Sequence, residues 1–117
     1  MVINQGDLFW LDLGEPAGSE PGSLHPFVVI QNDAFNKSQI KTTVVCALTS
    51  NRKLALAPGN VALHKGEGNL TKPSVVNISQ VMTVDKGELR EKIGQLSKKR
   101  MQEIVAGFEV LIQPRIL

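Results

Sequence analysis

Short runs of β-branched and aromatic residues recur along most of the chain, and each run is bounded by glycine, proline, asparagine or serine. Such runs are typical of strands in a small antiparallel sheet, because β-branched side chains fit the pleated surface and the bounding residues form turns. Five runs predict strands at residues 7–13, 27–31, 42–48, 60–63 and 74–78. Runs at 81–84 and 91–96 add two more strands. Asp85 is placed to cap a short turn between these last two.

One helix is predicted at the end of the chain. Ser97 is a favourable N-cap, and apolar residues then recur at helical spacing to form one stripe. The stripe consists of Met101, Ile104, Val105, Phe108, Leu111 and Ile112. Pro114 is expected to end the helix, because its ring has no amide hydrogen to continue the hydrogen-bond ladder. We expect this stripe to pack on the sheet.

Together these patterns predict a mainly β (α+β) fold, a small and partly open barrel with one C-terminal helix packed on its sheet. The 117 residues suit one domain, residues 1–117, with a single core. No apolar stretch reaches the roughly 18 residues of a membrane-spanning helix, and the N-terminus lacks the pattern of a signal peptide. The sequence therefore predicts a cytoplasmic protein with no membrane segment.

Cysteine and histidine are too sparse to predict a metal site. Cys46 is the only cysteine and lies in a strand-like apolar run, which favours a buried, unreactive thiol. His25 and His64 lie far apart and lack the paired spacing of zinc ligands. We expect no metal and no cofactor.

The formal net charge of +2 hides an uneven distribution. Residues 34–73 hold six basic side chains and one acidic side chain, a net charge of +5, whereas the rest of the chain carries −3. If the loops of this segment share one face, their positive potential suits a nucleic-acid backbone. An ordinary solvated surface with scattered charges is the alternative.

A long connection joins the first two predicted strands. It runs over the thirteen residues 14–26, with three glycines and three prolines, whereas hairpin loops usually need about two to five residues. Glycine permits close approach of a ligand, and proline limits the freedom of the loop. Pro26 also forces His25 towards an extended conformation at the start of the next strand.

Several of these segments together resemble the MazF/PemK toxin family, the ribonuclease components of toxin-antitoxin pairs. The similar segments are GDLFWLDL, GSEPGSLHPFVVIQND, VVCALTS and SQVMTVDKGEL, followed by the closing helix. The resemblance implies an SH3-like barrel of the CcdB/MazF type that forms a homodimer. It also implies metal-independent, sequence-specific cleavage of single-stranded RNA, and inhibition by a cognate antitoxin whose disordered tail folds across the active groove.

The resemblance also implies site residues, position by position. Thr49 matches the catalytic threonine that ends the third strand, whereas His25 stands where the family has its catalytic arginine. Ser19 and Glu20 match a pair in the loop motif, and Gln80 matches a glutamine that meets RNA. We expect RNA contacts from these three and from Ser50, Arg52 and Lys53. Ser79 and Met82 depart from the family pattern, which has an acidic residue and an arginine there.

Cleavage of RNA without a metal needs a base for the 2′-hydroxyl, an acid for the leaving 5′-oxygen and stabilisation of the charged transition state. Imidazole suits proton transfer near neutral pH but lacks the permanent charge and the two-pronged hydrogen bonding of a guanidinium. The loss of that contact would cost on the order of 3 kcal/mol, or about a hundredfold in rate. The Thr49 hydroxyl can donate to a phosphate oxygen, and Arg52 or Lys53 can supply charge.

Three functions stay open at this stage. The first is an active endoribonuclease in which His25 and Thr49 act on the scissile phosphate. The second is a catalytically impaired protein that binds RNA and antitoxin. The third, a gyrase inhibitor of the CcdB type, is disfavoured because those toxins use a tryptophan at the C-terminal helix end, and Trp10 is the only tryptophan here. Histidine before proline, threonine at a strand end and charges at a turn also occur as ordinary surface features.

Overall fold

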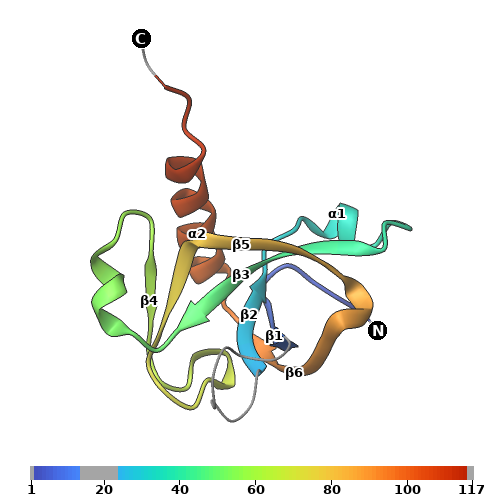
Figure 1. Ribbon diagram of the computed structural model, residues 1–117, viewed down its shortest axis with the longest axis horizontal. Coiled ribbons are helices and arrows are strands. Elements are labelled where there is room, and N and C mark those ends of the chain that lie inside the picture. The colour runs from blue at the N-terminus through green and yellow to red at the C-terminus, as the bar shows by residue number, and fades with distance from the viewer. Residues whose placement is uncertain (1, 14–23, 116–117) are drawn as a thin grey trace.

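The computed structural model describes residues 2–13 and 24–115, in which six strands form one antiparallel sheet (Figure 1). The strand order is β4-β5-β3-β2-β1-β6, and the sheet does not close, so β4 and β6 are its edges. The strands are β1 (Asp7–Asp12), β2 (Leu24–Val29), β3 (Thr42–Thr49), β4 (Val61–Leu63), β5 (Ser74–Asp85) and β6 (Leu89–Gln95). The helices are α1 (Asp33–Asn36) and α2 (Lys98–Leu111), with 3-10 turns η1 (Arg52–Leu56), η2 (Glu67–Asn69) and η3 (Lys86–Glu88). The mainly β fold with a C-terminal helix is confirmed.

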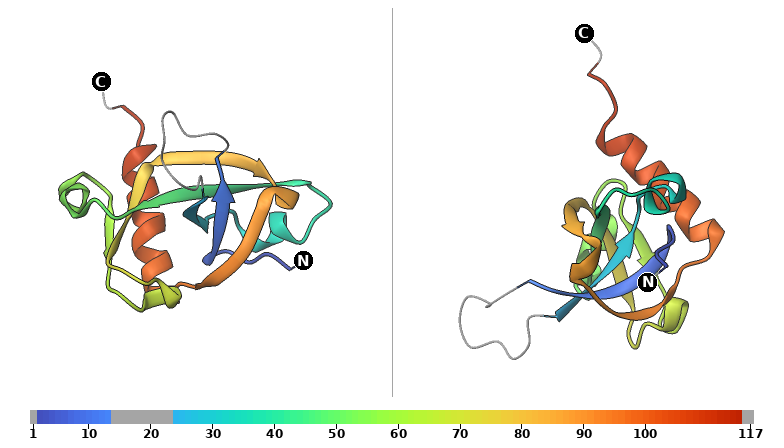
Figure 2. Two further views of the ribbon diagram at one scale, coloured as in Figure 1. Left: turned by 60° about the horizontal axis from the view of Figure 1, so that its bottom comes forward. Right: turned by 90° about the vertical axis from the view of Figure 1, so that its right-hand side faces the viewer.

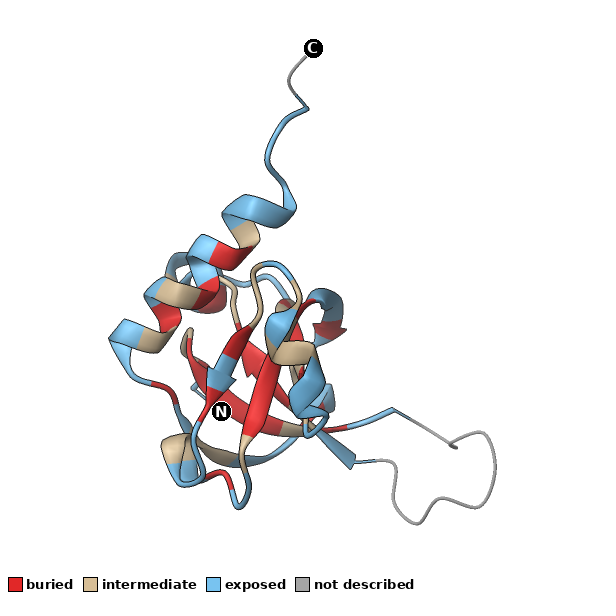
Figure 3. Cartoon of the chain, turned by 90° about the vertical axis from the view of Figure 1, so that its left-hand side faces the viewer, coloured by how far each residue is buried: buried red, intermediate tan, exposed pale blue. Residues whose placement is uncertain are grey.

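The sheet carries a hydrophobic core on each of its two faces, because successive side chains of a strand point to opposite sides. Neighbouring residues are divided accordingly: Leu8 lies in one core and Phe9 in the other. The first core contains Leu8, Val28, Cys46, Leu48, Val76 and Ile78 from the strands and Met101 and Ile104 from α2. The second contains Ile3, Phe9, Leu11, Phe27, Val29, Val45, Val84 and Leu89. Figure 3 shows these buried positions concentrated in the strands.

Helix α2 packs across β4 and β5 on the side of the first core (Figures 1 and 2). It begins as predicted, because the Ser97 hydroxyl accepts a hydrogen bond of 3.1 Å from the amide of Arg100. Its buried residues are Met101, Ile104 and Gly107. Gly107 lies against Gly59, in the turn before β4, so closely that an added Cβ would sit 2.3 Å from the Gly59 carbonyl oxygen. This contact brings the helix axis close to the sheet.

The prediction that the whole apolar stripe of α2 packs on the sheet is wrong for three residues. Val105, Leu111 and Ile112 are 40%, 48% and 74% exposed. The end of α2 near the C-terminus projects past the sheet and is largely exposed in Figure 3. The helix also ends at Leu111, with Ile112 as its C-cap, before Pro114 is reached. The residue preceding a proline is disfavoured in helical conformation, so the influence of Pro114 begins upstream of its own position.

Strand β5 is one strand of twelve residues, whereas two strands at 74–78 and 81–84 were predicted. Ser79 and Gln80 separate these two predicted runs. In the structure both are exposed residues within the strand, which stays paired with β3 on either side of an irregularity between Cys46 and Leu48. Asp85 precedes η3, as predicted. No helix in residues 2–13 and 24–115 has the length and apolarity that a membrane crossing requires.

Candidate active site

A groove of about 440 Å³ opens where β2 and β3 stop pairing. Their ladder ends at the Phe27 and Ala47 pair, one residue from Pro26, which has no amide to donate to a ladder. β2 nevertheless continues to Leu24, paired only with β1, so the predicted strand start at residue 27 was too late. The groove is lined by Leu13, His25, Phe27, Ala47, Leu48, Thr49, Asn77, Ser79, Gln80, Val81 and Met82.

His25 and Thr49 lie on the same face of the sheet, at this groove. Side chains two residues apart on a strand share a face, so His25 points with Phe27, and Thr49 points with Ala47. Phe27 and Ala47 are directly opposite each other. Continuing this register by two residues sets His25 opposite Thr49, and both line the groove. The topology therefore brings together two residues that are distant in the sequence.

The hydroxyl of Thr49 has one hydrogen-bond partner among the described residues. Its Oγ1 accepts a hydrogen bond of 3.1 Å from the amide of Asn51, which starts the turn into η1. The hydroxyl hydrogen is then available for donation, since a hydroxyl can accept and donate at once. Thr49 thus serves as a turn residue and is also placed to donate a hydrogen bond into the groove.

The β5 wall of the groove carries Ser79, Gln80 and Met82, all exposed. Gln80 is the third predicted site residue that the structure brings to this groove, after His25 and Thr49. An amide side chain can both donate to and accept from a base edge. Leu13, Phe27, Val81 and Met82 add apolar surface, on which an unstacked base can rest.

Arg52 and Lys53 do not line the groove. They lie in a neighbouring depression of about 560 Å³, together with His64, Lys65 and residues of β4 and β5. We call it the basic depression, because three of the described side chains that line it are cationic and none of them is acidic. Of the six basic residues in 34–73, these three share one site. Ser50 is exposed and lines neither cavity. Ser19 and Glu20 lie outside the described residues.

The groove and the basic depression adjoin each other across one pair of strands. Thr49, at the end of the groove, pairs directly with Val75 of β5, and Val75 lines the basic depression. Neighbouring strands lie about 4.8 Å apart, so a polymer that occupies the groove reaches the depression within a few ångströms. Among the described residues that line the groove there is no lysine, arginine, aspartate or glutamate. The strong positive potential therefore lies beside the groove.

Cys46 supports the groove wall from behind. The thiol is fully buried and Sγ donates a hydrogen bond of 3.1 Å to the carbonyl oxygen of Asn77. Burial raises the pKa of the Cys46 thiol to about 12, because the thiolate is poorly solvated there. The prediction of a buried thiol is confirmed, and at neutral pH it is fully protonated. Asn77 itself was not singled out from the sequence, although a polar residue inside the run 74–78 is a signal.

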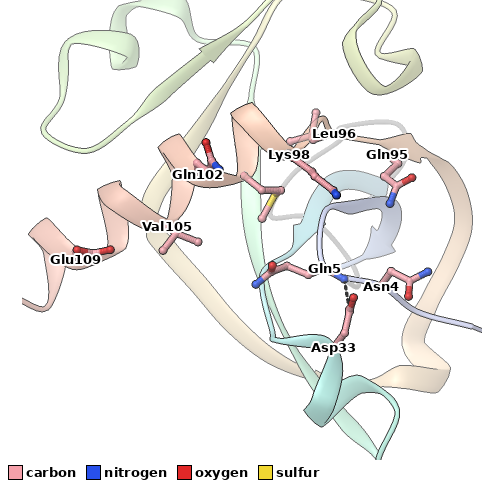
Figure 4. Close-up of a pocket in the computed structure, with 10 residues that line it drawn as sticks. Asn4, Gln5, Asp33, Gln95, Leu96, Lys98, Gln102, Val105 and Glu109 are labelled. Carbon is pink, nitrogen blue, oxygen red and sulfur yellow. Dashed lines mark hydrogen bonds between the residues drawn. The ribbon is translucent and has the colours of Figure 1, made fainter.

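A larger cavity, of about 650 Å³, lies elsewhere, between α2, the N-terminal segment and the start of α1 (Figure 4). Its polar lining includes Gln5 and Asp33, whose backbone amide and carboxylate are joined by a hydrogen bond of 2.6 Å. Met101 and Val105 contribute apolar surface from α2. None of the predicted site residues that the structure describes lines it. We place the chemistry in the smaller groove because His25, Thr49 and Gln80 converge there.

Comparison with known proteins identifies the family of the chain. A family model for PemK-like, MazF-like toxins of type II toxin-antitoxin systems matches residues 4–112. The chain belongs to this family. It is 38% identical to Endoribonuclease MazF6 of Mycobacterium tuberculosis over 92% of this chain and 95% of that protein. It is 39% identical to Endoribonuclease MazF of Staphylococcus saprophyticus, over 93% and 90%.

The fold of the family is also shared. A solved structure described as an endoribonuclease in complex with its cognate antitoxin, from Mycobacterial species, superposes with a TM-score of 0.78. It covers 97% of this chain and 99% of that chain at 23% sequence identity. At that level of identity the likeness concerns the fold. The resemblance read from the sequence segments is therefore confirmed at the level of family and architecture.

Proposed function

We propose that the protein is the toxin of a toxin-antitoxin pair and cuts single-stranded RNA at short sequences, with the 2′-hydroxyl as nucleophile and no metal ion. The family relationship supports the activity, and its relatives are named endoribonucleases. The observation that carries the assignment of residues is the shared groove: His25 and Thr49 meet there at the end of an interrupted ladder, with Gln80 on the opposite wall.

In the proposed reaction, His25 takes the proton from the 2′-hydroxyl of the nucleotide before the scissile phosphate. The 2′-oxygen attacks phosphorus, the bond to the 5′-oxygen breaks, and protonated His25 returns the proton to that oxygen. The products are a 2′,3′-cyclic phosphate and a 5′-hydroxyl end. Thr49 donates its hydroxyl hydrogen to a non-bridging oxygen, where negative charge builds up in the transition state.

The neighbouring basic depression suits a phosphate next to the one that is cut. Arg52, Lys53 and Lys65 supply permanent charge there, and phosphate contacts fix the register of a nucleic acid without reading its sequence. Ser50 lies between the two cavities along the chain and extends this path. Ser19 and Glu20 belong to the proposed RNA contacts by family position. The contacts to the RNA bases are then made in the groove, by Gln80 and its neighbours.

We further propose that the chain works as a homodimer, is held inactive by a cognate antitoxin, and acts in the cytoplasm, where messenger RNA is found. A structurally similar endoribonuclease is described in complex with its cognate antitoxin, which supports an antitoxin partner. The exposed apolar end of α2 supports self-association, since Val110, Leu111 and Ile112 are more than two-fifths exposed. A disordered antitoxin tail that lies in the groove would exclude RNA directly.

One observation favours a second candidate, a protein that binds RNA but cuts it poorly. The described lining of the groove has no permanent cation, and a neutral imidazole offers a phosphorane-like transition state less stabilisation than a guanidinium. The cations of the basic depression lie one strand away from Thr49. This candidate shares the groove, the partner and the substrate with the first and differs only in rate.

One experiment separates the two. The purified protein is incubated with a mixed-sequence single-stranded RNA in the presence of EDTA, and the new RNA ends are sequenced. Discrete fragments with 5′-hydroxyl ends are expected, with loss of cleavage in His25→Ala and Thr49→Val. Gln102→Ala, which alters a different cavity, is the matched control. Intact RNA at high protein excess, together with retained RNA binding, would establish the impaired protein, and unchanged cleavage by His25→Ala would exclude the role of His25.

A further inference from the structure

Asn77 is a groove residue with an unusual set of partners. It lies in β5, is partly buried, and lines the groove on the same wall as Gln80. Its backbone carbonyl accepts from the Cys46 thiol, and its side-chain Oδ1 accepts a hydrogen bond of 3.2 Å from Nδ2 of Asn60. Hydrogen bonds from Cys46 and Asn60 therefore hold both the backbone and the side chain of Asn77 in place.

The orientation of the Asn60 amide is determined by a backbone group. The amide of Ile78 donates a hydrogen bond of 2.9 Å to the Asn60 side chain, and only the oxygen of that side chain can accept it. The Asn60 nitrogen must then face the other way, where it donates to the carbonyl oxygen of Leu54 at 2.8 Å and to Asn77. A donor from Asn60 requires an oxygen on Asn77. The Asn77 oxygen is thereby turned towards Asn60, independently of how either amide is labelled.

The side-chain amide nitrogen of Asn77 therefore faces away from Asn60 and is available to a ligand in the groove. Among the hydrogen bonds between described residues, none uses Asn77 Nδ2 as a donor. An asparagine that recognises adenine needs its oxygen and its nitrogen together, as a donor-acceptor pair. Here the oxygen faces Asn60, so the atom of the amide that is left to face a ligand is the nitrogen, a hydrogen-bond donor. Such a donor pairs with O4 of uracil or O6 of guanine, and it is opposed by the exocyclic amine that cytosine and adenine carry at the same positions.

We propose that Asn77, held by Asn60, forms a base-binding subsite of the groove that takes a keto base of the RNA, uracil or guanine, and rejects adenine and cytosine. This subsite rests on the proposed function of the same groove. Asn77 follows Val75, the partner of Thr49, by two residues, which is about 7 Å along a strand and on the same face. The base that it reads belongs to a nucleotide adjoining the scissile phosphate.

The test exchanges the donor for an acceptor. Asn77→Asp keeps the shape of the side chain and an oxygen for Asn60, and replaces the amide nitrogen by an oxygen that accepts from an exocyclic amine. A pool of randomised single-stranded RNA is cut by each protein and the ends are sequenced. The parent protein should require uracil or guanine at one position near the cut. The variant should favour adenine or cytosine at that same position, with a change in preference of about tenfold or more.

Two further variants complete the design. Gln102→Glu introduces the same change of charge on α2, in a different cavity, and should leave the preference unchanged. Asn77→Ser removes the amide altogether, and should abolish the preference without inverting it, so it replaces Asn77→Asp if that variant does not fold. Thermal melting of each variant checks the fold.

Failure of this inference can be told apart from failure of the proposed function. If the parent protein cuts RNA and Asn77→Asp keeps its base preference, the subsite is refuted while the nuclease stands. If the parent protein does not cut, the same comparison is made by selecting bound sequences from a 2′-fluoro RNA pool, which cannot be cleaved. A keto preference that inverts in the variant supports the subsite there, and the absence of any preference refutes it.

Discussion

The groove has one ionisable side chain in its described lining, His25. Its described lining has no lysine or arginine, so the groove can perform proton transfer more readily than it can stabilise negative charge. For the second candidate, the protein that binds RNA but cuts it poorly, we expect His25→Arg to raise the rate of RNA cleavage between about tenfold and a hundredfold, because a guanidinium donates two parallel hydrogen bonds to a phosphate. Initial rates on a short fluorescent RNA measure the change. His25→Lys, a charge without the fork, should gain less; a slower His25→Arg variant would show that proton transfer limits the rate.

The Cys46 thiol provides a second test at the scale of single residues. It is fully buried, and its pKa is raised to about 12, so almost no thiolate exists at pH 8. We expect the native protein to resist a thiol reagent such as iodoacetamide at pH 8, and the protein unfolded in guanidinium to react completely. Mass spectrometry counts the adducts. Rapid alkylation of the native protein would contradict the burial of this side chain.

Single residues were also where the sequence was least informative about the site. The sequence indicated His25 and Thr49 as candidate catalytic residues. Their proximity, however, depends on the register of β2 and β3 and on the point where that ladder ends. Arg52 and Lys53 follow Thr49 closely in the sequence, yet η1 carries them to the neighbouring depression. The pairing of Asn60 with Asn77 joins residues 17 apart, and no spacing rule reveals it.

At the scale of elements, α2 comes close to the rest of the fold at Gly107. A Cβ there would sit 2.3 Å from the carbonyl oxygen of Gly59, which belongs to backbone and cannot move aside cheaply. We expect Gly107→Ala to destabilise the protein by about 2 kcal/mol or more, although alanine is by itself the better helix former by roughly 1 kcal/mol. Gly87→Ala, where a Cβ meets nothing within 4 Å, is the control and should change little. Urea unfolding measures both.

A charged contact fastens the start of α2 to η2. Arg100 donates from Nε and Nη2 to the two carboxylate oxygens of Glu67, each at 2.9 Å, and this hydrogen bonding holds the pKa of Glu67 below its ordinary value of 4.5. A carboxyl whose folded pKa is lowered stabilises the fold above its unfolded pKa and loses that contribution as pH falls through the folded pKa. Glu67→Gln should therefore cost about 1 kcal/mol at pH 7 and nearly nothing well below pH 4.

The measurement is the free energy of unfolding of both proteins as a function of pH. Glu109→Gln, at an exposed position of the same helix, serves as the control. A difference between Glu67→Gln and the parent protein that persists unchanged in acid would contradict an ionic origin.

Most elements could be predicted from the sequence, for reasons that the structure makes clear. The starts of β1, β3 and α2 were predicted correctly, because Gly6, the threonine pair at 42–43 and Ser97 are strong local signals. Strand β5 was divided in two because polar side chains that face a groove look like turn residues. The short elements α1 and η1 were missed, since their capping by Asn32 and Asn51 involves only a few residues each.

At the scale of the whole molecule, the C-terminal end of α2 exposes apolar side chains that nothing within one chain covers among the described residues. Val110 and Leu111 are 56% and 48% exposed beside Ile112. We expect the protein to sediment at about twice the 12.7 kDa of one chain, and the double variant Val110→Asp, Leu111→Asp to shift towards the monomer, since a charge at a buried contact is unfavourable. Analytical ultracentrifugation measures both.

The matched control is Val2→Asp, an apolar residue that is 75% exposed at the other end of the chain. It should leave the sedimentation coefficient unchanged. A parent protein that stays monomeric at high concentration would refute the dimer, and a dimer that survives the double variant would move the contact to another face.

Thr49 Oγ1 connects the two cavities through a single atom. Thr49 lines the groove, and its Oγ1 accepts the hydrogen bond from the Asn51 amide at the start of η1, which carries Arg52 and Lys53. A substitution that removes this hydroxyl also removes the hydrogen bond that holds the start of η1. It should therefore reduce both the rate of cleavage and the binding of RNA by Arg52 and Lys53. Serine keeps the hydroxyl oxygen, so Thr49→Ser preserves both the groove hydroxyl and the anchor of η1. Any other substitution at this position that inactivates the toxin removes both at once.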